Sequence, residues 1–220
     1  CGRLYDWSLE PTAALYFSQD ANEPLHAQMD FLKNTLSVNN EFPRDFKGRL
    51  IARVLDMEMK EIVRREVPVS VAAEAVVNNL AKIDFPESIS PVHFIKLELL
   101  DANDKPVSDT FYWRSDKKYT PGRTWTGPQL EGFEPLLTLP KIKPASQVVW
   151  SDEGDESVAT VTLKNDSSAL AFMVWLRLQH DETAKPVRPA FYDDNYFSLL
   201  PGESRTVNVR FSKKSADPAK

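Results

Sequence analysis

The chain has 220 residues, enough for one large domain or two domains of about 100 residues each. Its formal net charge is −5 and its 27 Lys and Arg residues are scattered, which disfavours binding to nucleic acid or anionic lipid through a basic patch. The longest apolar run, 169–176, is far shorter than the roughly 20 residues that a membrane span needs. Composition therefore predicts a globular protein with neither nucleic acid nor membrane as a partner.

Cys1 is the only cysteine, so the chain cannot form an internal disulfide. A cysteine at position one is compatible with a lipid-modified mature N-terminus. The residues that follow, however, include Leu4, Tyr5 and Trp7, which is too aromatic a run for a flexible tether. We therefore expect residue 1 to be the edge of a piece of a longer chain, which reports no signal peptide of its own.

Alternating apolar residues predict short strands in the first half of the chain. In 25–31 the odd-numbered residues, such as Ala27 and Met29, share one face, and His26 lies on the other. Similar stretches follow at 35–38, 50–54, 62–71, 95–99 and 107–113. Pro68 indicates an edge strand or a bulge, and the valines of 69–81 favour strand or irregular coil over helix. Short strands spaced by about ten residues are typical of an immunoglobulin-like sandwich.

Prolines and glycines gather in 115–144 and predict a domain boundary, followed by a lead-in strand around 136–142. A second set of strands is predicted at 158–163 and 169–178. In the tail, the turn at Pro201-Gly202 precedes a strand with Val207 and Val209 on one face and Asn208 on the other. No long helical period occurs in the chain. We therefore predict an all-β fold of two consecutive immunoglobulin-like β-sandwiches.

Carboxylates are the first candidates for chemistry. Hydrolysis of a glycosidic bond generally needs two carboxyl groups about 5 to 10 Å apart, but the neighbours Asp193 and Asp194 would point to opposite faces of a strand. The acidic run 152–156 surrounds Gly154 with oxygen ligands of the kind that calcium prefers. Its spacing does not match the helix-loop-helix calcium pattern, so a solvated hairpin loop is the favoured interpretation.

No other group of residues predicts a catalytic or metal site. His26, His93 and His180 are isolated in sequence, and two of the three fall at outward or edge positions of strands. Three serines, Ser115, Ser167 and Ser198, lie outside any nucleophile-elbow context. The analysis accordingly assigns no catalytic, cofactor-binding or metal-binding residue and no cofactor.

Aromatic side chains remain as candidates for stacking against a sugar ring. They are Trp113, Trp125, Trp150, Trp175, Tyr119, Phe191, Tyr192, Tyr196 and Phe197. The favoured interpretation is that most of them fill the cores or the seam with a neighbouring domain, where large amphipathic rings are common.

Several segments of the sequence resemble segments of a known protein family. They are Asp194-Asn195-Tyr196-Phe197-Ser198-Leu199-Leu200-Pro201-Gly202-Glu203, Val161-Thr162-Leu163-Lys164-Asn165, Asp45-Phe46-Lys47-Gly48, Phe111-Tyr112-Trp113 and Tyr5-Asp6-Trp7. In this order they are similar to the C-terminal immunoglobulin-like domains of family-two glycoside hydrolases of the exo-β-D-glucosaminidase and β-mannosidase type. The similarity extends over nearly the whole chain. One departure is Met57-Glu58-Met59, where an Asp-Gly turn is usual.

The resemblance implies that the catalytic barrel precedes these residues. Residues 1–13 would follow the barrel, 14–115 would form one sandwich, and 116–220 would form a linker plus the C-terminal sandwich. The chain would be a non-catalytic accessory region that packs on the barrel of the same polypeptide and shapes its cleft. Because the family's catalytic carboxylates lie on the barrel, none carries over to this sequence.

Alternatives remain open at this point. The parent could be a β-mannosidase, or the chain could be a stand-alone carbohydrate-binding or adhesion module. An oligosaccharide is therefore a second candidate partner. By the resemblance, we expect a bacterial protein that is periplasmic or secreted.

Overall fold

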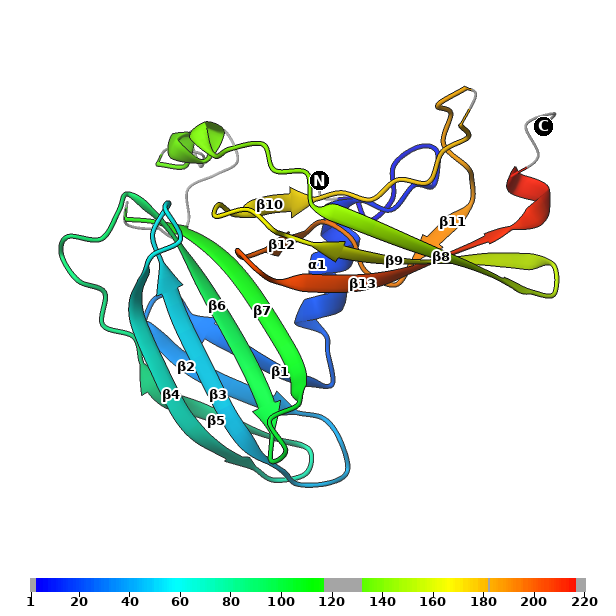
Figure 1. Ribbon diagram of the computed structural model, residues 1–220. Coiled ribbons are helices and arrows are strands. Elements are labelled where there is room, and N and C mark those ends of the chain that lie inside the picture. Colours follow the sequence, from blue (N-terminus) through cyan, green and yellow to red (C-terminus); the bar gives the residue numbers. More distant parts are fainter. Residues whose placement is uncertain (1–2, 117–131, 182, 217–220) are drawn as a thin grey trace. The chain divides into compact units, whose positions relative to one another are not determined.

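The computed structural model describes residues 3–116, 132–181 and 183–216, which form mostly β-strands (Figure 1). The chain forms two compact units. The first, Asp20–Leu139, is called here the N-terminal sandwich. The second combines Cys1–Gln19 with Pro140–Lys220 and is called the C-terminal sandwich. The division of the sequence at residues 13 and 115 stays a prediction.

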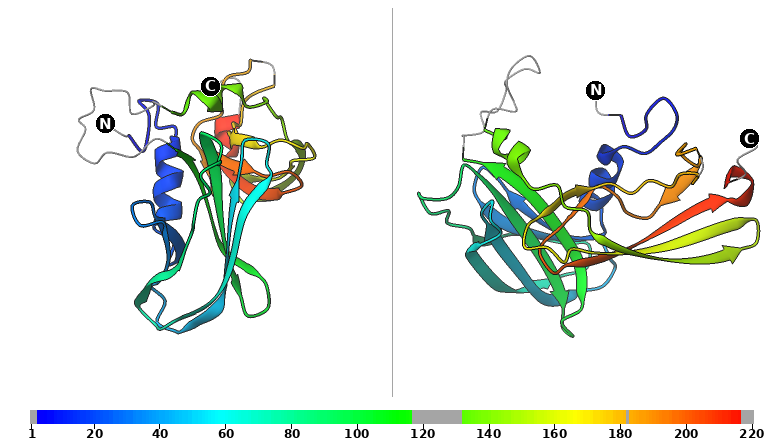
Figure 2. Two further views of the ribbon diagram at one scale, coloured as in Figure 1. Left: turned by 90° about the vertical axis from the view of Figure 1, so that its left-hand side faces the viewer. Right: turned by 45° about the horizontal axis from the view of Figure 1, so that its top comes forward.

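The N-terminal sandwich packs a three-stranded sheet against a four-stranded sheet, with all neighbouring strands antiparallel (Figure 2). The first sheet, in the order β1-β2-β5, contains β1 Leu25–Asp30, β2 Thr35–Asn40 and β5 Ala75–Lys82. The second, in the order β4-β3-β6-β7, contains β4 Glu61–Val71, β3 Phe46–Leu55, β6 Val92–Asp101 and β7 Pro106–Ser115. The predicted immunoglobulin-like sandwich is thereby confirmed for this half.

The core of this sandwich follows from the alternation. Leu36 and Val38 of the first sheet and Leu50, Val54 and Leu97 of the second are all fully buried in one cluster. Burying one such side chain contributes roughly 1.5–3 kcal/mol, so a one-residue slip of a strand would be very costly. The strand register is therefore fixed by the hydrophobic pattern.

The C-terminal sandwich has a four-stranded sheet in the order β11-β13-β9-β8 and a two-stranded sheet of β10 and β12. The bounds are β8 Ala145–Glu153, β9 Glu156–Lys164, β10 Ala171–Val174, β11 Ala190–Tyr192, β12 Phe197–Leu199 and β13 Ser204–Ser212. As predicted, Val207, Val209 and Phe211 are buried on one face of β13. The turn at Pro201-Gly202, with Gly202 at a φ of 82°, joins strands of two different sheets. The second all-β sandwich is confirmed as well.

One short α-helix is present among the described residues, α1 Ala13–Ala21; it is only nine residues long and its one buried residue is Tyr16. Two details of the sequence interpretation are wrong. The lead-in strand is instead the 3-10 helix η1 Glu134–Thr138, which has Pro135 in its first turn. The strand expected at 169–178 is only β10, because Met173 adopts a φ of 53° and the pairing with β12 is irregular. A second 3-10 helix, η2 Lys213–Ala216, ends the described residues.

The turn at Met57-Glu58-Met59 is built without glycine. The Asp56 carboxylate accepts hydrogen bonds from the amides of Glu58 (3.0 Å) and Lys60 (2.8 Å). Met59 takes the left-handed φ of 66° that Gly usually supplies. The β6–β7 turn repeats the arrangement, with Asp101 accepting from Asn103 and Lys105 at 2.8 and 3.0 Å. An aspartate that binds the turn's own amides thus replaces the Asp-Gly turn.

Each sandwich also anchors one loop with a buried asparagine at the end of a strand. Asn40 ends β2 and is fully buried; its amide donates to the carbonyls of Arg44 (2.8 Å) and Ala72 (2.9 Å), and its oxygen accepts from the Phe42 amide (3.2 Å).

Asn165 follows β9 and makes the same set of bonds in the C-terminal sandwich. Its amide donates to the carbonyls of Ala169 (2.8 Å) and Leu199 (2.9 Å), and its oxygen accepts from the Ser167 amide (3.1 Å). In both sandwiches one buried side chain therefore satisfies three backbone groups.

We predict that Asn40→Ala lowers the free energy of unfolding of the N-terminal sandwich by about 2 to 4 kcal/mol, because buried carbonyls lose their donor. The matched control is Asn39→Ala, whose side chain bonds only to Glu41 and whose loss should cost less than about 1 kcal/mol. Urea denaturation followed by circular dichroism measures both. Equal effects of the two variants would contradict the anchoring role.

Candidate functional site

The two adjacent aspartates are separated by the fold, as the strand pattern predicted. Asp193 accepts hydrogen bonds from the backbone amide and the side-chain amide of Asn208, both at 2.8 Å. Asp194 forms an ion pair with Arg205 at 2.5 Å. Each carboxylate thus has a structural partner of its own, and the two do not converge on one point.

The acidic run 152–156 forms the turn of the β8–β9 hairpin, which confirms the favoured interpretation. Gly154 has a φ of 63° at the tip. Asp152 lies 3.0 Å from Lys213 and accepts from Ser157 at 2.9 Å, and these contacts lower the pKa of its carboxyl. Glu153 pairs with Arg210. Within the described ranges, no group of three His, Cys, Asp or Glu residues could hold a metal ion.

The predicted outward placement is wrong for His26, and His93 is buried as well. His26 and His93 are only 5% and 2% exposed. His26 lies in β1 with Nδ1 3.4 Å from the Glu23 carboxylate. His93 lies in β6 on the same face as the core residue Ile95, and the opposite face is buried too, since Phe94 and Lys96 are 0% and 3% exposed. Alternation within a strand does not reveal that both faces of β6 are covered.

The serines take structural roles. Ser115 and Ser198 are buried, and the Ser198 hydroxyl accepts from the Met173 amide at 3.2 Å. Ser167 donates to the oxygen of Asn165 at 2.7 Å and so supports the loop anchor described above. These hydrogen bonds join the hydroxyls of Ser167 and Ser198 to Asn165 and to the Met173 amide, and not to a histidine.

The aromatic candidates divide into core and surface residues. Trp175 is 50% exposed, but Tyr196 stacks on its ring (centroids 6.0 Å apart) and the Arg177 guanidinium lies 5.4 Å from the ring centre. Burial raises the pKa of the Tyr192 hydroxyl, which accepts from the Leu178 amide at 2.7 Å. Trp150 and Phe191 are exposed, at 58% and 62%. Trp125 and Tyr119 lie outside the described residues.

The remaining described candidates confirm the packing interpretation in part. Phe197 is 7% exposed and belongs to the core of the C-terminal sandwich, and Trp113 is half-buried in β7. Among the described aromatic candidates, the exposed side chains are therefore Trp150, Trp175 and Phe191.

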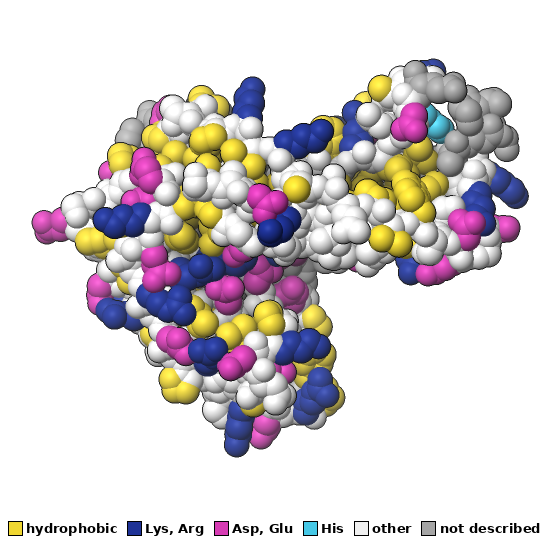
Figure 3. Space-filling view, viewed as in Figure 1, with side chains coloured by type: hydrophobic (Ala, Val, Ile, Leu, Met, Phe, Trp, Pro, Cys, Tyr) yellow, Lys and Arg dark blue, Asp and Glu magenta, His cyan; other side chains and the backbone are white. Residues whose placement is uncertain are grey.

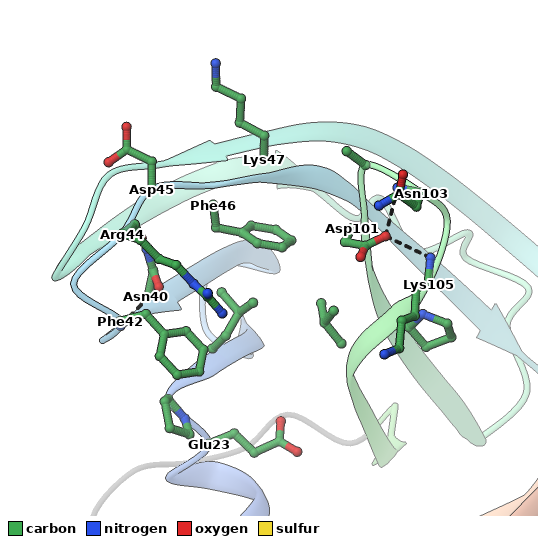
Figure 4. A pocket seen from close by; sticks show the side chains of 15 residues that line it. Glu23, Asn40, Phe42, Arg44, Asp45, Phe46, Lys47, Asp101, Asn103 and Lys105 are labelled. Carbon is green, nitrogen blue, oxygen red and sulfur yellow. Dashed lines mark hydrogen bonds between the residues drawn. The ribbon is translucent and has the colours of Figure 1, made fainter.

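A cleft of about 670 Å³ opens at one end of the N-terminal sandwich, and we call it the end cleft (Figure 4). Three pieces of chain form it: the start of β1, the loop from β2 to β3, and the β6–β7 turn. The lining residues used below are Glu23, Phe42, Arg44, Phe46, Asp101 and Lys105. Phe42 and Phe46 lie on one side of the cleft, and Asp101 and Lys105 on the other.

The two loops that border the cleft are held by the bonds already described. Asn40 fixes the β2–β3 loop that carries Phe42 and Arg44. Asp101 fixes the β6–β7 turn that carries Lys105, and its backbone hydrogen bonds lower the pKa of its carboxyl. The opening is therefore a shaped feature of the fold, because both of its walls are internally bonded.

Charges in the end cleft are balanced. The Arg44 guanidinium lies 5.3 Å from the centre of the Phe42 ring. Glu23 accepts from the Ser108 hydroxyl at 2.7 Å and lies 3.4 Å from His26 Nδ1. The cleft thus offers aromatic rings with polar groups of both signs, a composition suited to binding a polar ligand.

Sequence reasoning did not find the end cleft. Its residues stand at three distant points of the chain, and each stretch taken alone has only the composition of a turn. The one signal in the sequence is the turn-forming composition of Asn39-Asn40 and of 102–105. Antiparallel pairing of β3 with β6 brings these two turns to the same end of the sandwich.

The geometry defines the class of protein: two immunoglobulin-like sandwiches in tandem, in which the candidate carboxylates Asp152, Asp193 and Asp194 are engaged in structural contacts. Residues 123–220 match the family model described as the exo-beta-D-glucosaminidase Ig-fold domain, and residues 33–119 match the mannosidase Ig/CBM-like domain. These two stretches of the chain are therefore immunoglobulin-like domains of the kinds described for exo-β-D-glucosaminidases and mannosidases.

Similar proteins support this assignment. The chain is 29% identical to the exo-beta-D-glucosaminidase of Streptomyces avermitilis and 28% identical to that of Amycolatopsis orientalis, in each case over 95% of this chain. It matches only 24% and 21% of the length of those proteins. The crystal structure of the Amycolatopsis orientalis exo-chitosanase superposes with a TM-score of 0.85 at 25% identity, over 98% of this chain and 27% of that one. The resemblance inferred from the motifs is confirmed, and the chain spans about a quarter of these relatives.

Among the described residues, no helix is long and apolar enough to cross a membrane.

Gly48 allows β3 to approach β6 closely, because it has no side chain. It follows Phe46 and Lys47 in β3, and a Cβ there would lie 2.0 Å from the Leu100 carbonyl oxygen and 2.8 Å from Cζ of Phe46. We predict that Gly48→Ala destabilises the N-terminal sandwich by about 2 kcal/mol or more, since β3 must move away from β6. The neighbouring exposed Lys47→Ala serves as control, with a change below about 0.5 kcal/mol. Thermal unfolding of both variants decides; an unaltered G48A melting curve would refute the close approach.

His93 makes the stability of the N-terminal sandwich depend on pH. Burial lowers the pKa of His93 below its ordinary value near 6.5, and Nε2 has no hydrogen-bond partner among the described residues. The unfolded chain therefore takes up a proton near pH 6.5 that the folded chain resists. Stability is fully present above that value and is lost as pH falls below it, by at most about 1.4 kcal/mol per pH unit.

We predict that His93→Gln flattens this dependence between about pH 7 and pH 5. The measurement is the free energy of unfolding of each protein by urea across that range. The slope, not the absolute stability, is the readout, so a general destabilisation by the substitution does not affect the conclusion. An identical slope in H93Q would show that other groups cause the pH dependence.

Proposed function

We propose that this chain is the non-catalytic C-terminal accessory region of a retaining, exo-acting glycoside hydrolase of the exo-β-D-glucosaminidase type. In this proposal it packs on the catalytic barrel of the same polypeptide and shapes the approach to its cleft. The supporting observation is that relatives named as exo-beta-D-glucosaminidases match over 95% of this chain, while the match occupies only about a quarter of their length. A β-mannosidase is the alternative parent, supported by the mannosidase-type domain at 33–119.

The N-terminal segment supplies a surface for this packing. Leu4, Tyr5 and Trp7 are 45%, 46% and 89% exposed, and Leu9 is 79% exposed. The segment is held within the C-terminal unit by Glu10, which pairs with Arg188 at 2.5 Å and with Arg177 at 3.6 Å. Exposed apolar side chains on a fixed segment are typical of a surface that contacts another domain.

The first test is the activity of the chain alone. We expect the purified chain to release no p-nitrophenol from its β-D-glucosaminide or β-mannoside, because the described carboxylates are engaged in structural bonds. Turnover above the buffer rate, retained on repurification, would contradict the proposal.

The second test is the effect of the accessory region on its parent. Expression of the complete coding region with the triple substitution Leu4→Ser, Tyr5→Ser and Trp7→Ser should lower the melting temperature of the catalytic barrel and its activity. The matched control places a serine at the equally apolar Leu137, which is 88% exposed but lies in η1. If the triple variant behaves like L137S, the segment does not contact the barrel.

A second candidate function is the binding of an oligosaccharide at the end cleft. It is favoured by one observation, the pair Phe42 and Phe46 beside the polar groups Glu23, Arg44 and Lys105 in a space of about 670 Å³. Retention of the chain on insoluble chitosan or mannan, and its loss on Phe42→Ala, would support this function. Equal retention of F42A and wild type would exclude the cleft as the site.

A further inference from the structure

The strand β8 is an unprotected sheet edge. All nine of its residues are exposed, and it pairs with β9 on one side only. Natural proteins usually protect such edges with Pro, Lys or a bulge, because an open edge recruits another strand. Between Ala145 and Glu153 there is no Pro and no Lys, and the register with β9 is unbroken. The edge is therefore geometrically ready to accept a further strand.

The centre of this edge is also apolar on both faces. Val148 and Trp150 point to the core side, where Trp150 contacts the buried Phe211 edge-on with centroids 6.0 Å apart. Val149 points to the other face of the sheet and is paired with Thr160 of β9. These three residues are 43%, 58% and 58% exposed. Figure 3 shows hydrophobic side chains at the surface of the C-terminal sandwich, in the region of β8 and β11.

The core-side exposure has a simple cause. The sheet β11-β13-β9-β8 is four strands wide, whereas the facing sheet has only β10 and β12. Residues of β9 and β13 such as Ala159 and Val209 are buried beneath it, but the edge strand is not. Trp150 and Val148 thus lack cover that only something outside this sheet pair can supply.

We propose that two copies of this chain associate through β8, which pairs with itself in antiparallel register about Val149. In this register Val149 faces Val149, and Val148 of each copy faces Trp150 of the other. Gln147 faces Ser151, so polar residues flank the apolar centre. The inference is independent of the enzymatic activity proposed for the parent.

The sequence of the strand favours this register over its neighbours. Side chains alternate between the two faces of a strand. An alternative register that keeps the core faces of both copies on one side of the joined sheet must therefore differ by two residues. It would place Trp150 opposite Ser146, or Val148 opposite Asp152, and so would lose the pairing of Val148 with Trp150 and of Val149 with itself. Only the register about Val149 pairs all three apolar residues with one another, and pairs of aromatic and β-branched residues across strands contribute roughly 0.2–1 kcal/mol each.

Charge complementarity supports the same arrangement. This register also brings Lys143, which precedes β8, beside the β8–β9 turn of the other copy, which contains Asp155, twice by symmetry. Both residues are exposed. The other acids of the hairpin, Asp152 and Glu153, are already paired with Lys213 and Arg210 of their own chain. The partner that fits this edge in both shape and charge is therefore a second copy.

The sharpest test uses the two-fold axis, because only the residue on the axis meets itself. In a Cys1→Ser background, which removes the only native thiol, Val149→Cys should form a disulfide-linked dimer on mild oxidation. Directly opposite residues of an antiparallel pair have Cα atoms about 4.5–5.5 Å apart, within the range of a disulfide. Gln147→Cys is the matched control: it is exposed on the same face of the same strand but would face Ser151.

We expect V149C to cross-link at least about ten-fold faster than Q147C in this experiment. Equal rates for the two variants would overturn the proposed register, and absence of cross-linking in both would overturn the association itself.

A second measurement does not depend on cysteine. Sedimentation equilibrium of the complete chain between about 1 and 100 µM should show a monomer–dimer equilibrium. Val149→Lys places two ammonium groups opposite each other and should weaken the dimer at least about ten-fold. Val76→Lys, a similar change at an exposed valine in β5, should leave the equilibrium unchanged. A wild-type chain that stays monomeric over this range would overturn the proposal and would leave the edge to another domain.

Discussion

The structure depends on backbone groups being satisfied where strands end and loops begin. Asn40 and Asn165 do this in the two sandwiches with the same three bonds: one accepted from the amide two residues on, one donated to the carbonyl four residues on, and one donated to a distant strand or loop. A buried carbonyl without a donor costs about 1–3 kcal/mol. The loops that these residues hold are therefore parts of the rigid fold, and in the N-terminal sandwich one of them forms a wall of the end cleft.

Polar side chains that are engaged in structural bonds also explain why the chain offers exposed apolar surfaces and few free reactive groups. The carboxylates that attract attention in the sequence, Asp193, Asp194 and Asp152, are engaged with Asn208, Arg205 and Lys213. Apolar residues, by contrast, remain exposed on the N-terminal segment and along β8. Surfaces of this kind fit a region whose role is to contact other parts of a larger protein or a second copy of itself.

Strand alternation predicted the fold because each sandwich buries one face of each sheet. The sets around Leu36, Leu50 and Val207 could be assigned to the core from spacing alone. The same rule failed for Lys96, because both faces of β6 are buried, and a two-residue period does not indicate whether the second face is covered. It also failed for α1, which is too short for a helical period to stand out and buries only Tyr16.

By itself, the sequence determined the all-β class, most of the residues that face the two cores and the similarity to these immunoglobulin-like domains, since these follow from local periodicity and from motifs that keep their order. Tertiary structure alone decided the end cleft and the open edge of β8. The cleft requires turns at the ends of β2 and β6 to meet. The edge is open because a four-stranded sheet faces a two-stranded one. Both are properties of how strands pair across long stretches of chain, which no local pattern specifies.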